Sequence, residues 1–409
     1  MSAEAPLIYL IAGEPSGDAL GGRLMAALKE RSGGAVRFAG IGGERMAEQG
    51  LDSLVPLHEL AVMGVAEVLP RARLILRRVK ETVAEIRRLR PRAVVTIDSS
   101  GFTWRVAQRL RAAGERDLPL IHYVAPMVWA WRGGRARRMA RWYDHLMVLL
   151  PFEPPYFAKV GLACTYVGHP VVESGADRGD GPGFRRRHGI APEAPLLAVL
   201  PGSRRGEVGR LLAPFAGAVA LLAARYPGLR VVVPTTETVA DRVAEAIRGW
   251  AAPALLVRGE GEKYDAFAAS DAALAASGTV ALELAMAGVP AVVAYRLNPL
   301  THSLVRRMVK VGHVHLLNLI LGRDVVPELI QQDCTPERLA GAVDALIADK
   351  ARSRAQIADC REALKRLGLG ELSPSRRAAD VVLSLITAPL GGAERSLRPN
   401  SGNSRGGIR

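Results

Sequence analysis

Residues 272–295, AALAASGTVALELAMAGVPAVVAY, decide the fold, because they read as a strand, a tight turn, a short helix and a second strand. The first strand, Ala272 to Ala275, is an apolar run of the kind that parallel sheets bury on both faces. It gives way to Ser277-Gly278-Thr279, where a helix begins. A helix start presents amide groups without partners, and two hydroxyls accompany them here, so this turn is suited to bind an anion.

Glu283 follows Thr279 by four residues, which is one helical turn, so we expect its carboxylate on the same face as the turn. There it can accept hydrogen bonds from the hydroxyls of a sugar attached to the anion. A phosphate with a ribose beside it indicates a nucleotide. The alternative that this segment leaves open is that Ser277 only caps the helix and Glu283 faces solvent.

Short apolar runs recur along the chain and are separated by stretches of helical length, which predicts an α/β protein with two doubly wound, Rossmann-like domains facing across a cleft. The expected strands are Leu7–Ala12, Ala93–Ile97, Leu120–Val124, His145–Leu150, Leu196–Leu200, Leu229–Val233, Ala254–Val257, Ala272–Ala275 and Ala291–Tyr295. The glycine-rich residues 179–183 read as the linker. We expect an N-terminal domain over 1–175, a C-terminal domain over 184–388 whose last helix can pack back on the first, and a disordered basic tail over 389–409.

Length and composition are consistent with this organisation. A chain of 409 residues is too long for one core and fits two domains. The three cysteines, Cys164, Cys334 and Cys360, are far apart, which argues against a disulfide framework or a zinc site and favours a reducing compartment. The first apolar run follows Glu4 without a basic leader, and no uncharged run is long enough to span a bilayer, so we expect a soluble or peripheral protein.

The net charge of +15 is concentrated in one region, since residues 71–141 hold 18 Lys and Arg against 5 Asp and Glu. Nucleic acid and an anionic membrane surface are the two candidate partners. Apolar residues next to the arginines favour the membrane, because such a segment can dip into lipid while the arginines meet headgroups. These residues include Met63, Val68, Leu69, Leu74 and Ile75. The alternative is an ordinary amphipathic helix whose apolar face lies on the core.

Other loops after the expected strands also carry candidate site residues. Residues 13–22, GEPSGDALGG, have glycines that allow a tight turn and close approach to a ligand, although they do not form a dinucleotide fingerprint. Asp98 follows a strand, where it could act as a general base or simply cap the next helix. Gly202-Ser203-Arg204 could hold a diphosphate by amide, hydroxyl and guanidinium groups. For Asn318 and residues 322–332, helix capping, an interface and a substrate role all remain open.

Taken together, the motifs resemble those of the lipid-A-disaccharide synthase family over nearly the whole chain up to about residue 385. The stretches that carry the resemblance are AGEPSGD (12–18), GIGGERM (40–46), MGVAEVL (63–69), YVAP (123–126), VWAWR (128–132), LPFE (150–153), VGHP (167–170), LPGSR (200–204), SGT (277–279) with Glu283, and YR (295–296). Their number and order make the resemblance specific.

The resemblance implies a two-domain GT-B glycosyltransferase that joins UDP-2,3-diacylglucosamine to 2,3-diacylglucosamine 1-phosphate (lipid X), with inversion and without metal or cofactor. It implies Asp98 and Glu14 as catalytic carboxylates. The donor UDP would be held by Gly202, Ser203, Arg204, Ser277, Gly278, Thr279 and Glu283. The acceptor and the membrane would be faced by Ser16, Gly17 and Asp18 together with Met63, Val68, Leu69, Leu74 and Ile75. The implied location is the cytoplasmic face of the inner membrane, with no nucleic-acid partner; a homo-oligomer remains open.

The chain departs from the family pattern in the loop after Ile97. The pattern is commonly Asp-Ala-Pro-Asp-Phe-Asn, whereas here Asp98-Ser99-Ser100-Gly101-Phe102-Thr103 keeps the first acid and lacks the second. Leu317 likewise stands where a proline is usual. The competing enzyme class is a UDP-N-acetylglucosamine 2-epimerase, which resembles this architecture and its Ser-Gly-Thr/Glu arrangement but needs no apolar, basic segment.

Overall fold

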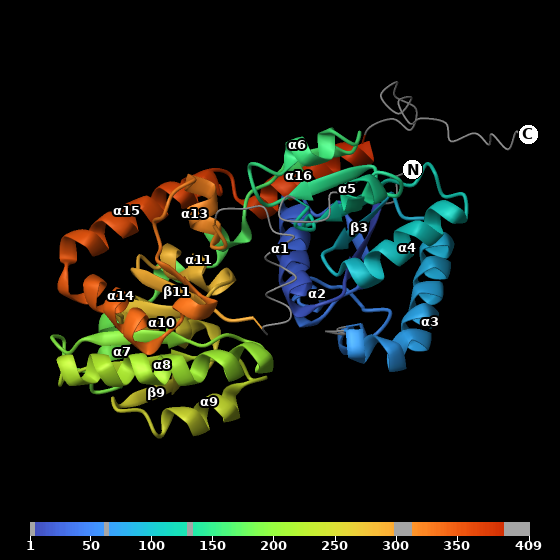
Figure 1. Cartoon of the computed structure of the whole chain (residues 1–409). Coiled ribbons are helices and arrows are strands. Elements are labelled where there is room, and N and C mark those ends of the chain that lie inside the picture. The colour runs from blue at the N-terminus through green and yellow to red at the C-terminus, as the bar shows by residue number, and fades with distance from the viewer. Residues whose placement is uncertain (1–4, 61–64, 129–133, 298–312, 388–409) are drawn as a thin grey trace, which may run out of the picture. The chain divides into compact units, whose positions relative to one another are not determined.

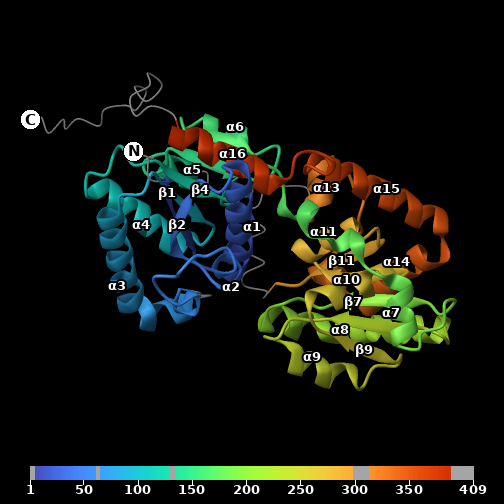
Figure 2. The same ribbon diagram turned by 180° about the vertical axis from the view of Figure 1, so that it is seen from behind.

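The computed structural model describes residues 5–60, 65–128, 134–297 and 313–387, and they fall into two compact units. The first unit contains the described residues up to Pro170 together with those from Leu372 onward, and the second unit is Val171–Glu371 (Figures 1 and 2). Each unit is built around a six-stranded parallel sheet. The prediction of an α/β protein with two doubly wound domains is therefore confirmed.

The first unit has the strand order β2-β1-β3-β4-β5-β6. Its strands are β1 (Leu7–Ala12), β2 (Arg37–Ile41), β3 (Ala93–Ile97), β4 (Leu120–Tyr123), β5 (His145–Val148) and β6 (Ala163–Tyr166). Its helices are α1 (Pro15–Arg31), α2 (Glu44–Ala47), α3 (Val65–Leu89), α4 (Ser100–Ala112), α5 (Gly134–Met139), α6 (Pro154–Ala158) and α16 (Pro374–Thr387). The order reverses between β1 and β3, which makes the carboxyl ends of these two strands the switch point where doubly wound sheets bind ligands.

Side chains of β1 show why this sheet is buried on both faces. Ile8 and Leu10 point into one apolar core with α1 and α16, whereas Tyr9 and Ile11 point into a second core with residues of α3 and α4. All four side chains are fully buried. Figures 1 and 2 show the corresponding helices on opposite sides of the sheet. A strand with this environment needs a continuous apolar run rather than an alternating one.

Helix α16 returns from the far end of the sequence to pack against α1 of the first unit. Val382 and Ile386 belong to the core that lies on the α1 side of the sheet. Exposed ion pairs between the two helices, such as Arg31 with Asp380 at 2.7 Å, add little, because solvent screens them. Burial of the apolar face therefore holds α16 in place.

The second unit repeats the plan with the order β12-β11-β10-β7-β8-β9. Its strands are β7 (Leu196–Leu200), β8 (Arg230–Pro234), β9 (Ala254–Val257), β10 (Ala272–Ala276), β11 (Ala291–Tyr295) and β12 (Glu328–Ile330). Its helices are α7 (Gly181–Arg187), α8 (Arg205–Arg225), α9 (Ala240–Ile247), α10 (Glu260–Ala269), α11 (Thr279–Met286), α13 (Leu316–Leu321), α14 (Pro336–Ala348) and α15 (Lys350–Arg366). The switch point here lies between β7 and β10.

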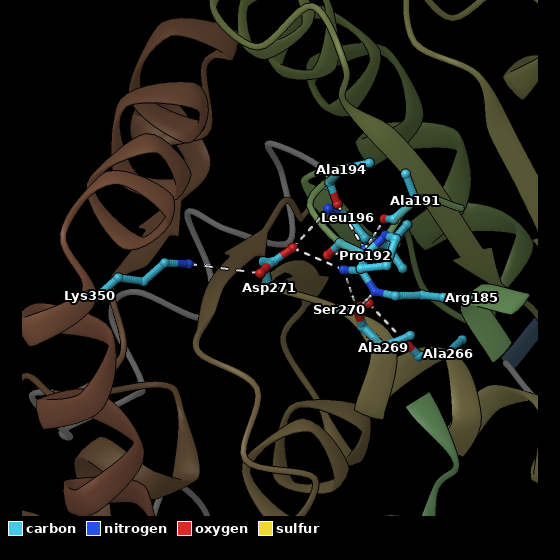
Figure 3. A network of polar contacts seen from close by, with 10 residues as sticks. All are labelled: Arg185, Ala191, Pro192, Ala194, Leu196, Ala266, Ala269, Ser270, Asp271 and Lys350. Atoms are coloured by element: carbon cyan, nitrogen blue, oxygen red, sulfur yellow. Dashed lines mark hydrogen bonds and ion pairs between the residues drawn. The ribbon is translucent and has the colours of Figure 1, made fainter. Parts of the chain in front are cut away.

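A polar network fixes the amino ends of β7 and β10, opposite the switch point (Figure 3). The guanidinium of Arg185 donates to the carbonyls of Ala194 at 2.9 Å and Ala269 at 2.7 Å, and it pairs with the Asp271 carboxylate at 3.1 Å. The same carboxylate accepts from the amide of Leu196 at 3.0 Å. One arginine and one aspartate thus hold the two strands in register, and this register sets where their carboxyl ends lie.

The glycine-rich residues 179–183 are not a linker. Asp180 caps α7 by accepting from the amide of Gly183 at 2.9 Å, and α7 packs on α10 inside the second unit. Gly181 is needed there because a Cβ at this position would lie 2.4 Å from the carbonyl oxygen of Ala268. The boundary between the units falls at Pro170 and Val171 instead.

Candidate functional site

Each switch point opens into a cavity. In the second unit the loops after β7 and β10 line a cavity of about 330 Å³, and in the first unit the loops after β1 and β3 line one of about 380 Å³. Neighbouring parallel strands end at the same sheet edge, which is how residues far apart in the sequence come together. We describe the two cavities separately.

The Ser277-Gly278-Thr279 turn lines the cavity of the second unit. The amide of Ser277 continues the sheet by donating to the carbonyl of Ala294 at 3.0 Å, so it does not take part in anion binding. Helix α11 begins at Thr279. The amide of Ala281 donates to the carbonyl of Gly278 at 3.2 Å, whereas the amides of Thr279 and Val280 precede the first hydrogen bonds of the helix. Gly278 and Thr279 are exposed, which leaves this turn open to a ligand.

The loop after β7 lines the opposite side of the same cavity with Gly202, Ser203 and Arg204. Gly202 has φ of +112°, a conformation that favours glycine, and a Cβ there would lie 2.2 Å from Oε2 of Glu207. The Glu207 carboxylate folds back over the loop and accepts from the amide of Ser203 at 3.3 Å. Burial raises the pKa of Glu207. The sequence analysis gave no role to Glu207, which lies in the first turn of α8.

Glu283 lines this cavity too, on the face that the helical spacing predicts. Its two carboxylate oxygens accept from Nζ of Lys263 at 3.1 and 3.0 Å, and one of them also accepts from the hydroxyl of Tyr264 at 3.3 Å. Lys263 itself lines the cavity. Lys263 and Tyr264 both lie within α10, away from any strand end or motif, so the sequence gave no signal for them. Their hydrogen bonds fix the orientation of the Glu283 carboxylate.

The cavity of the first unit brings together Asp98 and Glu14, the two predicted catalytic carboxylates. Asp98 directly follows β3 and has φ of +48°, and Ser99 has φ of +46°, so two successive non-glycine residues adopt the left-handed conformation. Burial raises the pKa of Asp98. Gly13 permits the close approach of the two loops, since a Cβ at this position would lie 2.2 Å from Oγ of Ser99.

The wall of this cavity is half apolar. Leu60, Ala72, Ile75, Leu76 and Phe102 line it beside the carboxylates, and Arg105 adds a positive charge that sequence reasoning missed. Leu76 is 42% exposed. Helix α3 packs on α4, and Ile75 contributes to the core, so the amphipathic alternative explains part of this helix. Leu74 is half-buried; Met63 lies outside the described residues, as do the side chains of Val68 and Leu69.

The three acceptor residues predicted in the first loop, Ser16, Gly17 and Asp18, do not line this cavity. The carboxylate of Asp18 is buried and accepts from the amides of Gly43 at 2.7 Å, Arg45 at 3.0 Å and Met46 at 3.1 Å, so it caps α2. This contradicts an acceptor role for Asp18. Gly17 is buried against β1 and β3, with Ala12 at 3.4 Å from the place of a Cβ, and Ser16 is exposed on the first turn of α1.

The glycines at 21 and 22 also serve packing rather than ligand approach. A Cβ on Gly22 would lie 2.7 Å from the carbonyl oxygen of Arg45, and one on Gly21 would lie 2.5 Å from Sδ of Met46. They therefore let α1 approach α2 closely, which corrects the expectation that they approach a ligand.

Asn318 has a structural role as well. Its side chain is fully buried, donates to the carbonyl of Val326 at 2.8 Å and to Glu328 at 2.7 Å, and accepts from the amides of Val325 and Val326 at 2.9 Å. These bonds hold the chain that leads into β12. All of its hydrogen-bonding capacity is used, so the Asn318 side chain has none left for a substrate.

Two further findings concern metals and membranes. Across the described ranges, no three His, Cys, Asp or Glu side chains gather as metal ligands would. By length and composition, α8 is the one helix in the described part of the chain that could cross a membrane, and its Phe215 and Leu211 are buried in the core of the second unit. The three cysteines are all described and carry no disulfide.

Comparisons with known proteins identify the family. The family model for lipid-A-disaccharide synthetase matches residues 8–382. A lipid-A-disaccharide synthase of Rhodospirillum centenum is 61% identical over 381 residues, covering 93% of this chain and 95% of the relative. Among solved structures, the UDP-GlcNAc 2-epimerase of Neisseria meningitidis has a TM-score of 0.59 at 10% identity, covering 92% of this chain and 98% of the epimerase. A calicheamicin glycosyltransferase has a TM-score of 0.55 at 17% identity, covering 95% of this chain and 100% of the other.

At these identities the two structures show the fold alone, which is the GT-B architecture of glycosyltransferases and related epimerases. The family model and the curated relative span both units, including the loops that line the two cavities. The chain therefore belongs to the lipid-A-disaccharide synthase family.

Proposed function

We propose that this chain is an inverting glycosyltransferase that condenses UDP-2,3-diacylglucosamine with 2,3-diacylglucosamine 1-phosphate. The products are the β-1,6-linked lipid A disaccharide 1-phosphate and UDP. Family membership supports the reaction. The observation that carries it is the convergence of Gly202–Arg204, Ser277–Thr279 and Glu283 on one cavity of the second unit, where they match the parts of a uridine diphosphate.

In this proposal the second unit binds the donor. Amides at the start of α11 and the Arg204 guanidinium hold the diphosphate, and Glu283 accepts bonds from the ribose hydroxyls. As the bond from the anomeric carbon to the diphosphate breaks, negative charge grows on the leaving group. The positive helix start and Arg204 stabilise that charge, which lowers the barrier to departure.

The first unit binds the acceptor and supplies the base. Asp98 takes the proton of the acceptor hydroxyl. The oxygen of that hydroxyl forms the new bond to the anomeric carbon as the bond from this carbon to UDP breaks and UDP departs. A carboxyl with a raised pKa is a stronger base than an ordinary aspartate, which suits this step. Glu14 in the same cavity orients the acceptor, and the apolar wall with Ile75 and Leu76 covers its acyl chains.

The assay that tests this proposal mixes the protein with both substrates and follows UDP release together with disaccharide formation. A second reaction contains the UDP-sugar alone. We expect UDP only when the acceptor is present. Conversion of the donor at its second carbon without acceptor would instead identify a 2-epimerase, and inactivity with both substrates would refute the proposed reaction.

We also propose that the chain acts at the cytoplasmic face of the inner membrane, because both substrates carry acyl chains. The exposed Leu76 beside Arg73 and Arg77 supports contact with anionic lipid. Flotation with phosphatidylglycerol vesicles tests this contact. Leu76→Ser should reduce the bound fraction, whereas Leu221→Ser, at a leucine that is 46% exposed on α8, should not. Equal binding by both variants would exclude Leu76 from the membrane surface.

A further inference from the structure

We propose that Thr103 is a positioning residue for the transfer reaction, holding Asp98 in the backbone conformation from which its carboxylate reaches the acceptor. The inference rests on the proposed function, in which Asp98 is the base. It concerns a residue at which this chain departs from the common Asp-Ala-Pro-Asp-Phe-Asn pattern, since threonine replaces the final asparagine.

The backbone at Asp98 needs support, because Asp98 and Ser99 both have φ near +48°. L-residues adopt this region with difficulty, and two in succession persist only where the surroundings fix them. The amide of Asp98 donates to the carbonyl of Tyr123 at 2.9 Å, which anchors one side of the residue to β4. The carbonyls of Asp98 and Ser99 then point toward the start of α4.

Thr103 supplies the second anchor. Its hydroxyl lies 2.9 Å from the carbonyl oxygen of Asp98 and 3.0 Å from that of Ser99, and the residue is fully buried. A threonine within a helix commonly bonds the carbonyl four residues earlier, which accounts for the contact with Ser99. The contact with Asp98, five residues earlier and outside the helix, is not part of that habit. One hydroxyl thus bridges both residues of the left-handed pair.

A cluster of buried polar side chains, from β3, β4 and the loop before β5, packs next to Thr103. The hydroxyl of Thr96 on β3 contacts Nδ1 of His122 at 2.7 Å and donates to the hydroxyl of Tyr143 at 3.2 Å, and Tyr143 lies beside Thr103. All three side chains are at most 1% exposed. Burial lowers the pKa of His122 to about 3, so the cluster stays uncharged and unchanged through the working pH range. Its role is to fix geometry.

The decisive experiment compares three variants of the full chain. Thr103→Val removes the hydroxyl and keeps the shape, Thr103→Ser keeps the hydroxyl, and Thr82→Val is the control. Thr82 is equally buried, and its hydroxyl donates to the carbonyl of Arg78 at 2.7 Å within α3; neither residue lines the cavity that contains Asp98. Steady-state kcat and KM for both substrates, UDP affinity and the melting temperature are measured for each.

We expect Thr103→Val to lower kcat by roughly 10- to 100-fold, because a catalytic group displaced by about 1 Å costs that much. UDP affinity should stay at the wild-type value, Thr103→Ser should restore kcat to within about threefold, and Thr82→Val should keep it. If Thr103→Val does not fold, Thr103→Ala gives the same comparison without added bulk.

Wild-type kcat in the hydroxyl-free variant would overturn the inference. So would an equal loss of kcat in Thr82→Val, or failure of the serine to restore it, since both would indicate loss of packing rather than of position. These outcomes differ from failure of the proposed function, in which the wild-type protein itself produces no disaccharide.

Discussion

At the switch point of the first unit, the loops after β1 and β3 carry carboxylates, whereas at that of the second unit the loops after β7 and β10 carry amides, hydroxyls and an arginine. The two sheets have the same parallel plan and place their cavities at equivalent strand ends. The residues that follow the strand ends, and not the sheets themselves, therefore set the chemistry. One cavity suits a hydroxyl that must lose a proton, and the other suits a diphosphate that must leave.

The two loops also differ in how they make their sharp turn. After β7, Gly202 takes the positive φ of +112° that a glycine adopts without strain. After β3, Asp98 and Ser99 take positive φ although both have side chains. In the first unit the turn has a strained backbone, and the strained residue Asp98 carries the carboxylate. In the second unit the turn presents backbone amides, so a glycine without a side chain can occupy the strained position. This contrast predicts that the first cavity is the more sensitive to change.

The largest effect is expected for Asp98→Asn, which removes the base and preserves the shape of the turn. Turnover should fall by about 10²- to 10⁴-fold, the usual contribution of a general base. UDP affinity, measured by calorimetry, should not change, because the donor cavity belongs to the other unit. Asp52→Asn, at an exposed aspartate, is the control. Near-normal turnover in Asp98→Asn would show that the cavity of the first unit does not supply the base.

The next effect is expected for Arg204→Ala in the donor cavity. Loss of a hydrogen bond to a charged phosphate should weaken UDP binding by about 10- to 100-fold. Arg205→Ala is a matched control, since Arg205 is the next residue, is also exposed and does not line the cavity. Equal losses in the two variants would mean that Arg204 acts through general charge and not through contact with the diphosphate.

The sequence predicted all of the central strands and the edge strand β9, and it missed the other three edge strands. Strands β2, β6 and β12 were not expected, and all three lie at the edge of a sheet. Each is short and partly exposed, so none needs a continuous apolar run; β2, for instance, begins at the exposed Arg37. Central strands such as β7 are buried on both faces and must be apolar throughout. Periodicity and hydrophobicity report burial, and edge strands have little of it.

Site residues follow the same logic. Asp98, Arg204 and Glu283 stand at strand ends or one turn beyond, where parallel topology indicates a ligand, so the sequence could place them. Lys263 lies inside α10 and reaches the cavity only through its long side chain, which no pattern reveals. The prediction for Asp18 was wrong for the opposite reason. A carboxylate in a glycine-rich stretch looked functional, but it accepts hydrogen bonds from backbone amides that are distant in the sequence.

A smaller effect sharpens the role of Glu283. Because Lys263 holds both oxygens of its carboxylate, Glu283→Gln should weaken UDP binding by about tenfold. Binding of pyrophosphate, which lacks the ribose, should be unchanged. Glu260→Gln is the control, since Glu260 also bonds Tyr264 but does not line the cavity. An equal loss of UDP and pyrophosphate affinity in Glu283→Gln would indicate that the carboxylate acts on the phosphate loop instead of on the sugar.

The smallest effect separates catalysis from stability at the first cavity. Burial raises the pKa of Asp98, so the folded state binds its proton more tightly than the unfolded state does. Stability is therefore lost as pH rises from the ordinary aspartate pKa of about 3.9 through the raised value. Asparagine does not ionise, so Asp98→Asn should melt at a higher temperature than the wild type at pH 7. The difference should shrink as the pH is lowered toward 4, because the folded wild-type protein binds a proton at Asp98 over an increasing fraction of molecules. Melting curves across pH 4 to 7 would measure this difference, and Asp52→Asn should follow the wild type because Asp52 is exposed.

A lower melting temperature of Asp98→Asn throughout this range would mean that the charged carboxylate stabilises the strained turn. In that case the turn would not hold a base at the expense of stability, and the contrast with the glycine-based loop of the second unit would need another cause.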